Sequence, residues 1–261
     1  GVDFQNFIQE DSAHNIILNL NQYIGGGIAV ADVNNDNQPD LYFVSSSGKN
    51  CLYLNESQGS GGIKFRDITD AAGVGNQEGF KTSVTAADVN ADGWIDLFVC
   101  HAGPDLAGRA AKLFINNGLS PNPSPNGARG VTFTERAEEY GLADKSPATG
   151  ANFFDYDNDG DLDCYLLNYP TDQVHANRIT LKYGPDGKTT VPDLDPKVEY
   201  DSDNLYRNDS PSPALPNGAG IKFVNVSKEA GIQNFGFGLS VSVSDVNADG
   251  WLDVYVANDF V

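Results

Sequence analysis

The sequence predicts an all-β chain, a β-propeller built of four-stranded antiparallel blades. Two observations carry this prediction. A nine-residue acidic stretch occurs four times, and each copy lies between two strand-like segments. Each copy also opens a longer unit that has the strand pattern of a propeller blade. The copies begin at positions 32, 88, 155 and 245 and read DVNNDNQPD, DVNADGWID, DYDNDGDLD and DVNADGWLD.

The acidic stretch has the composition of a cation-binding loop. Oxygen-bearing side chains occupy its first, third, fifth and ninth places, and its seventh residue offers a backbone carbonyl. Alternate spacing in a tight loop brings several oxygens to one point, which suits a hard cation such as Ca²⁺. Gly93, Gly160 and Gly250 fill the sixth place, where a sharp turn needs positive φ, and Asn37 fills it in the first copy. The expected ligands are Asp32, Asn34, Asp36, Gln38 and Asp40; Asp88, Asn90, Asp92, Trp94 and Asp96; Asp155, Asp157, Asp159, Asp161 and Asp163; and Asp245, Asn247, Asp249, Trp251 and Asp253.

These loops are not EF-hands. An EF-hand needs a bidentate Glu at the twelfth place and a helix on each side, whereas the twelfth residues here are apolar and the flanks are strand-like. A single such stretch would be read equally well as an ordinary Asp/Asn/Gly turn. Four copies between strands favour calcium instead, with three to four ions bound. The copy at Asp32 departs most from the pattern, through Asn37 and Pro39, so we expect it to bind most weakly.

Each loop is followed by the remaining strands of a blade. A short third strand is predicted at 52–55, 113–116 and 205–208, and an alternating fourth strand at 63–68, 131–135 and 221–226. A helical turn that ends in Gly73, Gly141 or Gly231 follows, because glycine suits the left-handed residue that closes a helix. The predicted division of the partial propeller 1–261 is 2–9 as the last strand of a preceding blade, 24–70, 80–137 and 148–228 as whole blades, and 237–261 as the first half of another.

The whole chain resembles the FG-GAP or VCBS repeats of integrin α-subunit propellers and of the cartilage acidic protein family, including its ASPIC/UnbV-like bacterial relatives. The residues that carry the resemblance are the four loops, Phe237-Gly238 before the last loop, and the segment 98–104, which is similar to the GAP segment. The resemblance implies seven blades, an exported protein, and adhesion or scaffolding more often than catalysis. The chain has no Met and no signal peptide, so we expect a mature or excised piece of a larger propeller.

Composition narrows the function further. The net charge of −20 argues against nucleic acid or an anionic membrane as partner. No apolar run approaches the roughly 18 residues of a membrane span, and three cysteines give no disulfide framework. Open-sided calcium loops suit the calcium concentration outside cells, so we expect a secreted or cell-surface protein, associated with the outer membrane in a bacterium.

Two classes of function remain. The first is a binding or scaffold module for a protein or glycan at the cell surface, joined to the rest of its own propeller or to a larger surface complex. The alternative is a propeller-based carbohydrate-active enzyme, a lyase or hydrolase. No nucleophile motif or paired acid and base supports the enzyme, so no catalytic residue is predicted and the binding module is favoured.

A long insertion at 168–203 is the predicted partner surface. It lies between the second and third strands of its blade, on the face opposite the acidic loops, and it serves either for binding or as a cover. The histidines His14, His101 and His175 also fall on that face, but nothing in their spacing shows the convergence that a zinc or catalytic site would need. The candidate partner residues are Tyr169, His175, Arg178, Tyr183 and Tyr200.

Overall fold

The fold was obtained as a computed structural model that describes residues 1–8, 10–12, 15, 23–59, 61–103, 105–120, 130–171, 176–197, 200–210 and 220–259. The chain is all-β, as predicted, and three of its sheets are four-stranded and antiparallel. Blade 1 is β1 (Ile28–Ala31), β2 (Asp40–Phe43), β3 (Cys51–Asn55) and β4 (Phe65–Asp67). Blade 2 is β5 (Phe80–Ala87), β6 (Asp96–Ala102), β7 (Lys112–Leu119) and β8 (Val131–Glu135). Blade 3 is β9 (Ala148–Phe154), β10 (Asp163–Asn168), β13 (Asn204–Asn208) and β14 (Phe223–Asn225).

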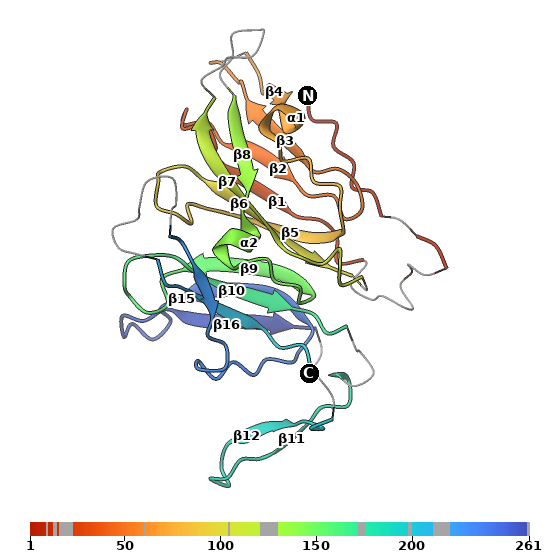
Figure 1. The fold of residues 1–261 in the computed structure, drawn as a ribbon, viewed down its shortest axis with the longest axis vertical. Coiled ribbons are helices and arrows are strands. Elements are labelled where there is room, and N and C mark those ends of the chain that lie inside the picture. Colours follow the sequence, from red (N-terminus) through yellow and green to blue (C-terminus); the bar gives the residue numbers. More distant parts are fainter. Residues whose placement is uncertain are drawn as a thin grey trace.

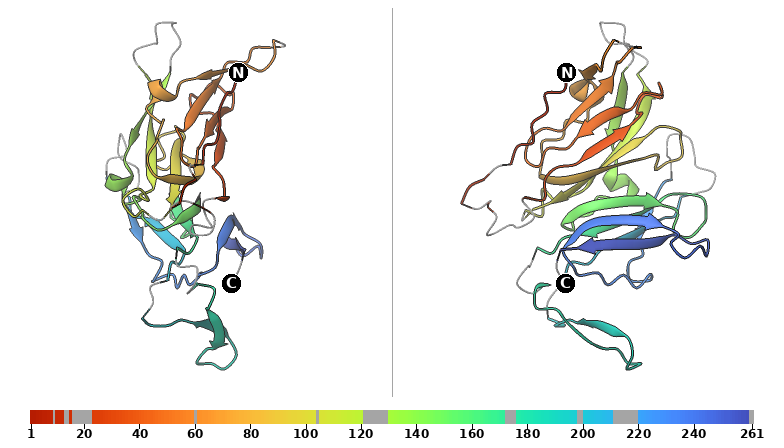
Figure 2. Two further views of the ribbon diagram at one scale, coloured as in Figure 1. Left: turned by 90° about the vertical axis from the view of Figure 1, so that its right-hand side faces the viewer. Right: turned by 180° about the vertical axis from the view of Figure 1, so that it is seen from behind.

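The sheets are arranged like neighbouring blades of a propeller. Their first strands β1, β5, β9 and β15 (Gly238–Ser244) lie side by side in that order, and each sheet extends outward from its first strand (Figure 1). The last sheet contains only β15 and β16 (Asp253–Asn258). In the two further views of Figure 2, β1 and β15 stay at opposite ends of this row. The described strands therefore form blade-like sheets without closing into a ring, and they leave the expected number of seven blades untested.

Aromatic rings fill the spaces between blades. Between blades 2 and 3, Phe98 packs edge-on against Phe153 at 5.6 Å between ring centroids, and Phe153 packs against Phe223 at 6.3 Å. Cys100 and Cys164 are buried in the same cluster, as expected for structural strand residues. Each blade thus buries one face against the next, which is where an alternating strand places its apolar side chains.

Repeated hydrogen bonds fix how consecutive blades meet. Thr82 donates its hydroxyl to the carbonyl of Ala148 at 2.6 Å, and the equivalent Thr149 donates to the carbonyl of Gly238 at 2.8 Å. Between blades 1 and 2 the approach is so close that a Cβ on Gly27 would lie 2.6 Å from the amide nitrogen of Val84. Glycine is therefore required at this contact.

The helical turns follow the sequence prediction. Helix α1 (Thr69–Ala72) ends at Gly73 and helix α2 (Ala137–Tyr140) ends at Gly141. Both glycines have left-handed backbone conformations, with φ of 77° and 80°. Neither helix, nor any other in the described part of the chain, is long and apolar enough to cross a membrane.

The N-terminal segment corrects one expectation. Residues 2–8 form no strand and instead run along blade 1. Phe4 stacks on Phe43 at 4.8 Å, and the Tyr53 hydroxyl donates to Asp3 at 2.7 Å. The amide of Ser47 also donates to the carbonyl of Phe7 at 2.9 Å. The alternating pattern that predicted a blade-ending strand at 2–9 therefore reflects side chains that pack on an existing blade.

The insertion in blade 3 corrects a second expectation. No strand was predicted within it, but it contains a hairpin of β11 (Thr180–Tyr183) and β12 (Thr190–Asp193). The strands are short and lie on either side of the turn sequence Gly184-Pro185-Asp186-Gly187, so they give little periodic signal. The hairpin projects away from the blades, at the bottom of Figure 1.

Candidate metal centres

The four acidic loops lie along one rim of the molecule. Each joins the first and second strands of its sheet, so all four leave the sheets at the same end. Neighbouring loops also touch. The side-chain amide of Asn35 donates to the carbonyl of Gly93 at 3.0 Å, and that of Asn158 donates to Gly250 at 3.4 Å.

All four loops share one hydrogen-bond scheme. In the loop that starts at Asp88, its carboxylate accepts the main-chain N–H groups of Asp92 and Gly93 at 3.0 and 2.8 Å. Asp92 in turn accepts the N–H of Trp94 at 2.9 Å. These bonds turn the first and fifth carboxylates toward the inside of the loop. The same three bonds occur in the loops that start at Asp32, Asp155 and Asp245.

Backbone conformation explains part of the loop sequence and adds a feature that was not predicted. The sixth residues have positive φ, from 65° at Asn37 to 99° at Gly160, as expected. The fourth residues do as well: φ is 53° at Ala91 and 60° at Ala248. Asn35 and Asn158 occupy this place in the other two loops. Because Asn tolerates this region better than Ala, its presence there was the signal that could have revealed the second turn.

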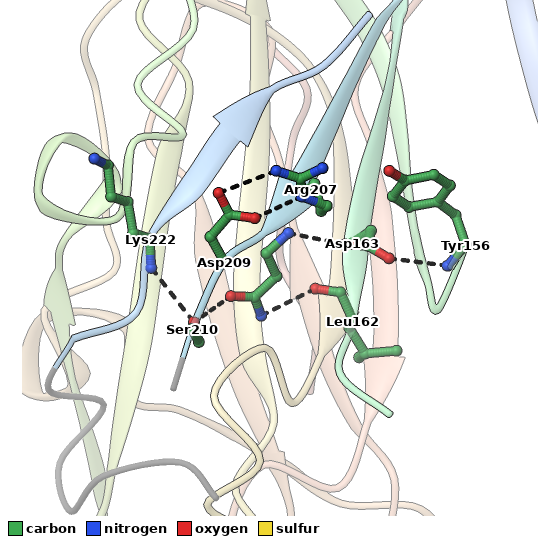
Figure 3. A network of polar contacts seen from close by, with 8 residues as sticks. Tyr156, Leu162, Asp163, Arg207, Asp209, Ser210 and Lys222 are labelled. Carbon is green, nitrogen blue, oxygen red and sulfur yellow. Dashed lines mark hydrogen bonds and ion pairs between the residues drawn. The ribbon is translucent and has the colours of Figure 1, made fainter. Parts of the chain in front are cut away.

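The ninth aspartate joins each loop to the third strand of its blade. Asp163 accepts the N–H of Tyr156 at 2.9 Å on one oxygen and that of Asn208 at 2.8 Å on the other (Figure 3). The Asn208 side chain then donates to the carbonyl of Leu162 at 3.3 Å. The same arrangement joins Asp40 to Val33 and Asn55, and Asp96 to Val89 and Asn116.

The contact between the ninth aspartate and the third strand was not predicted from the sequence, although the sequence contains a pattern that indicates it. All three blades have an asparagine at the equivalent place of the third strand: Asn55 and Asn208 are the last residues of β3 and β13, and Asn116 lies within β7. A polar residue repeated at one place of a strand without an obvious packing role points to a polar contact. Each oxygen of the ninth carboxylate accepts a single backbone bond, so a second lone pair on each oxygen is left for a cation.

Burial makes the charge of the ninth aspartate unfavourable when no cation is present. It raises the pKa of Asp96 to about 8, and the pKa values of Asp40 and Asp163 to about 6. The two backbone N–H donors at each site lower the pKa, but they do not outweigh desolvation. Asp96 is therefore largely protonated at neutral pH unless a positive charge lies nearby, and Asp40 and Asp163 take up a proton more readily than an exposed aspartate does.

The loop from Asp155 to Asp163 is the most complete candidate for a cation site. Carboxylate oxygens of Asp155, Asp157 and Asp159 lie within 4.8 Å of one another. Two buried carboxylate oxygens of this loop, Oδ1 of Asp157 and Oδ1 of Asp161, have no hydrogen-bond partner in the described structure. Desolvation, with the neighbouring aspartates, raises the pKa of Asp161 to about 7. Converging oxygens with unused lone pairs fit a hard divalent cation.

In the other three loops an asparagine replaces the third aspartate. Its side-chain NH₂ donates to the fifth aspartate: Asn34 to Asp36 at 3.0 Å and Asn90 to Asp92 at 2.9 Å, for example. Asn247 donates in the same way to its own fifth residue. These loops therefore hold one negative charge fewer than the Asp155 loop at the converging positions, and they are expected to hold a cation less tightly.

The predicted partner residues differ in their exposure to solvent. Tyr169 is buried and packs edge-on against Phe237 at 5.0 Å, so it is a core residue of the blade 3 seam. Tyr200 packs against Phe235 at 5.9 Å. Arg178 and Tyr183 are exposed. His175 lies outside the described residues, as does His14.

The blade-like sheets and the acidic loops define a class of propeller-type repeat proteins, and the comparison with protein families agrees with this class. Residues 32–99 match the family model of the FG-GAP-like repeat. This stretch holds the first two loops, strands β2 to β4 of blade 1, and the first hairpin of blade 2 as far as the middle of β6. The resemblance predicted from the loops is thereby confirmed: this part of the chain is similar to an FG-GAP-like repeat.

A similar protein is cartilage acidic protein 1 of Xenopus tropicalis. The chain is 30% identical to it over 164 residues. That match covers 62% of this chain and 22% of the relative. The chain thus corresponds to less than a quarter of that protein's length.

Proposed function

We propose that this chain is a calcium-stabilised, propeller-type module that acts outside the cell as a binding or scaffold surface for a protein or glycan. The observation that carries the calcium part is the Asp155 cluster, where three carboxylates converge and a buried oxygen of Asp157 lacks a partner. Asp155, Asp157, Asp159 and Asp163 would hold the ion there, with the carbonyl of Asp161. The corresponding residues of the other three loops would hold weaker-bound ions.

Calcium would act on the fold rather than on a substrate. Without a cation, clustered carboxylates repel one another and the buried ninth aspartates are poorly solvated. An ion that binds only the folded loop stabilises the protein by mass action. Because the ninth aspartate also holds the third strand, the ion would stiffen the joint between the loop and its blade.

Two observations support a place outside the cell. Open-sided loops of this type suit the millimolar calcium found there, and the similarity to cartilage acidic protein 1 and to FG-GAP-like repeats points the same way. The acidic surface of a chain with net charge −20 disfavours nucleic acid as the partner.

The projecting hairpin is the proposed contact for the partner. Leu181 and Tyr183 lie on one face of β11, two residues apart, and are 61% and 75% exposed. An exposed tyrosine beside an exposed leucine is typical of an interaction surface. The hairpin stands clear of the blades, so a partner could reach both side chains (Figure 1).

Two measurements test the proposal. Excess chelator should lower the melting temperature, by roughly 2–4 °C for each kcal/mol of lost binding energy, and an unchanged melt would contradict a calcium role.

Binding to glycan arrays and to surface-protein panels should fall in the L181S/Y183S double variant but not in Lys188→Ala, a matched change at the tip of the same hairpin. Turnover of a polysaccharide by the purified chain would instead favour the enzyme.

A further inference from the structure

The end of blade 2 that is farthest from the acidic loops holds buried positive charge. Lys81 and Arg109 are the only Lys and Arg side chains buried among the described residues. Lys81 lies near the start of β5, whereas the acidic loop follows the end of that strand. The two ends of one blade therefore carry opposite buried charges.

Lys81 has no anionic partner among the residues that the structure describes. Its ammonium donates to the carbonyls of Glu78 and Gly79, both at 3.3 Å, and no carboxylate of the described residues forms an ion pair with it. Glu78, whose charge acts weakly on Lys81, is exposed. Burial lowers the pKa of Lys81 to about 8.

Arg109 has fewer hydrogen-bond partners than Lys81 in the described structure. Its side chain is 7% exposed, and its Nε is buried without a hydrogen-bond partner in the part of the chain that the structure describes. Arginine stays protonated in proteins, so this charge cannot be lost by titration. A buried charge without a partner is costly. The sequence offers 36 acidic residues, yet none of the described ones pairs with either cation.

The two cations come from chain segments in direct contact. A Cβ on Gly79 would lie 2.0 Å from the carbonyl oxygen of Gly108, the residue before Arg109. The same Cβ would lie 2.9 Å from the ring of His101. Lys81 binds the carbonyl of Gly79, so its ammonium lies at this glycine contact.

His101 holds the site but does not supply its charge. It is the cross-strand partner of Lys81. Its Nδ1 donates to the carbonyl of Val99 at 3.3 Å, and its Nε2 accepts from the side chain of Asn76 at 3.1 Å. Both ring nitrogens are thus occupied in the neutral form. Burial and the charge of Lys81 lower the pKa of His101 to about 4, in agreement with this assignment.

We propose that Lys81 and Arg109 form a binding site for an oxyanion, a carboxylate or sulfate group of a ligand, at the end of blade 2 opposite the acidic loops. The planar guanidinium pairs with two oxygens of such a group, and the ammonium adds a compact charge. The missing counter-ion comes from the ligand rather than from the chain. This site does not depend on calcium binding by the loops.

The test uses inorganic sulfate and acetate as probes, against chloride at equal ionic strength and constant calcium. Bound anion should raise the melting temperature of the wild type by roughly 2–4 °C. Lys81→Met and Arg109→Gln should lose this rise. Arg66→Gln should keep it, since Arg66 is already paired with Glu56 on the surface. A response to sulfate alone, to acetate alone or to both supports the site and identifies the preferred group.

Two further measurements keep the test valid if a variant folds poorly. In chloride buffer Lys81→Met should melt above the wild type, because it removes an uncompensated buried charge and keeps the shape of the side chain. Calorimetry on the wild type should give one anion per chain. An equal rise in all four proteins, no rise and no heat in the wild type, or a lower melt of Lys81→Met in chloride would overturn the proposal.

Discussion

The loops that start at Asp88 and Asp245 differ at a single position, Ile95 against Leu252. Their internal hydrogen bonds are the same, and the fourth residue is left-handed in both. Their surroundings differ. Val89 is buried, whereas the equivalent Val246 is 78% exposed.

The difference comes from the third strand. Asp96 is buried and accepts two backbone N–H groups, one of them from Asn116 on β7. Asp253 is half-buried and accepts one, from Val246, because no third strand lies beside β16 among the described residues. The loop conformation is thus set by nine local residues, whereas the burial of the ninth carboxylate is set by the blade. The following predictions test whether loop conformation is determined locally and burial of the ninth carboxylate by the rest of the blade.

The largest effect is expected at the ninth aspartate. Asp96→Ala leaves the buried N–H groups of Val89 and Asn116 without acceptors, which should cost about 2–4 kcal/mol of unfolding free energy. Asp253→Ala removes one bond at a half-exposed site and should cost less than about 1 kcal/mol. Urea unfolding in chelator measures both. Equal losses would mean that the third strand does not matter.

The seventh residue should show the next effect. Trp94 is half-buried and lies against Gly118, whose φ is 71° and where a Cβ would come within 2.9 Å of the indole. Trp251 is 53% exposed. Trp94→Ala should therefore cost about 2 kcal/mol, less than a fully buried tryptophan, and Trp251→Ala less than about 0.5 kcal/mol. Gly118→Ala, which pushes the same indole from the other side, should reproduce the loss at Trp94.

A smaller effect follows from pH, through the protonation of buried aspartates, of which Asp96 titrates at the highest pH. Its folded pKa of about 8 lies above the ordinary value, so the folded state holds this proton more tightly than the unfolded state. The stability that it contributes is full below about pH 4 and is lost as the pH rises through 8. Without calcium, the unfolding free energy should fall between about pH 6.5 and 8.

Two features make this pH measurement specific. His101, with a lowered pKa, contributes an opposite slope, but that slope is complete near its ordinary value of 6.5. Asp96→Asn should flatten the decline above that pH, and saturating calcium should flatten it too, because the ion favours the charged carboxylate. A decline that persists in Asp96→Asn would assign it to other groups.

The smallest effect is expected at the fourth residue. Ala91 has a positive φ of 53°, which costs a non-glycine residue about 1 kcal/mol. Ala91→Asn copies Asn35 and Asn158 and should stabilise the protein by about 0.5–1 kcal/mol, and Ala248→Asn should do the same because the local conformation is shared. Ala91→Val, which is β-branched, should destabilise. Opposite responses at the two alanines would show that the loops are not locally determined.

The sequence was sufficient for the local features of the fold. Residue spacing predicted the loops, the strands on either side, and the glycines that close the helical turns, since these depend on neighbours in the chain. The third-strand asparagines were visible as a repeat, but their role was not, because Asn116 meets Asp96 only when the blade is assembled.

Contacts between segments that are distant in the sequence were the main feature that the sequence did not predict. The pattern of residues 2–8 resembles a strand, yet Phe4 and Asp3 contact blade 1 as side chains. Tyr169 appeared suited to binding because it lies in an insertion, but Phe237 of the neighbouring sheet buries it. That Lys81 and Arg109 are buried without an ion-pair partner among the described residues could not be foreseen either, because burial and pairing are properties of the folded chain.

The central claim is that four loops with one hydrogen-bond scheme are calcium sites, and counting the ions tests it most directly. Anomalous diffraction from crystals grown with calcium, with calorimetry in solution, should locate three to four ions, one inside each occupied loop. The loop at Asp155 should fill first and the loop at Asp32 last. The absence of an ion from every loop at millimolar calcium would contradict the account.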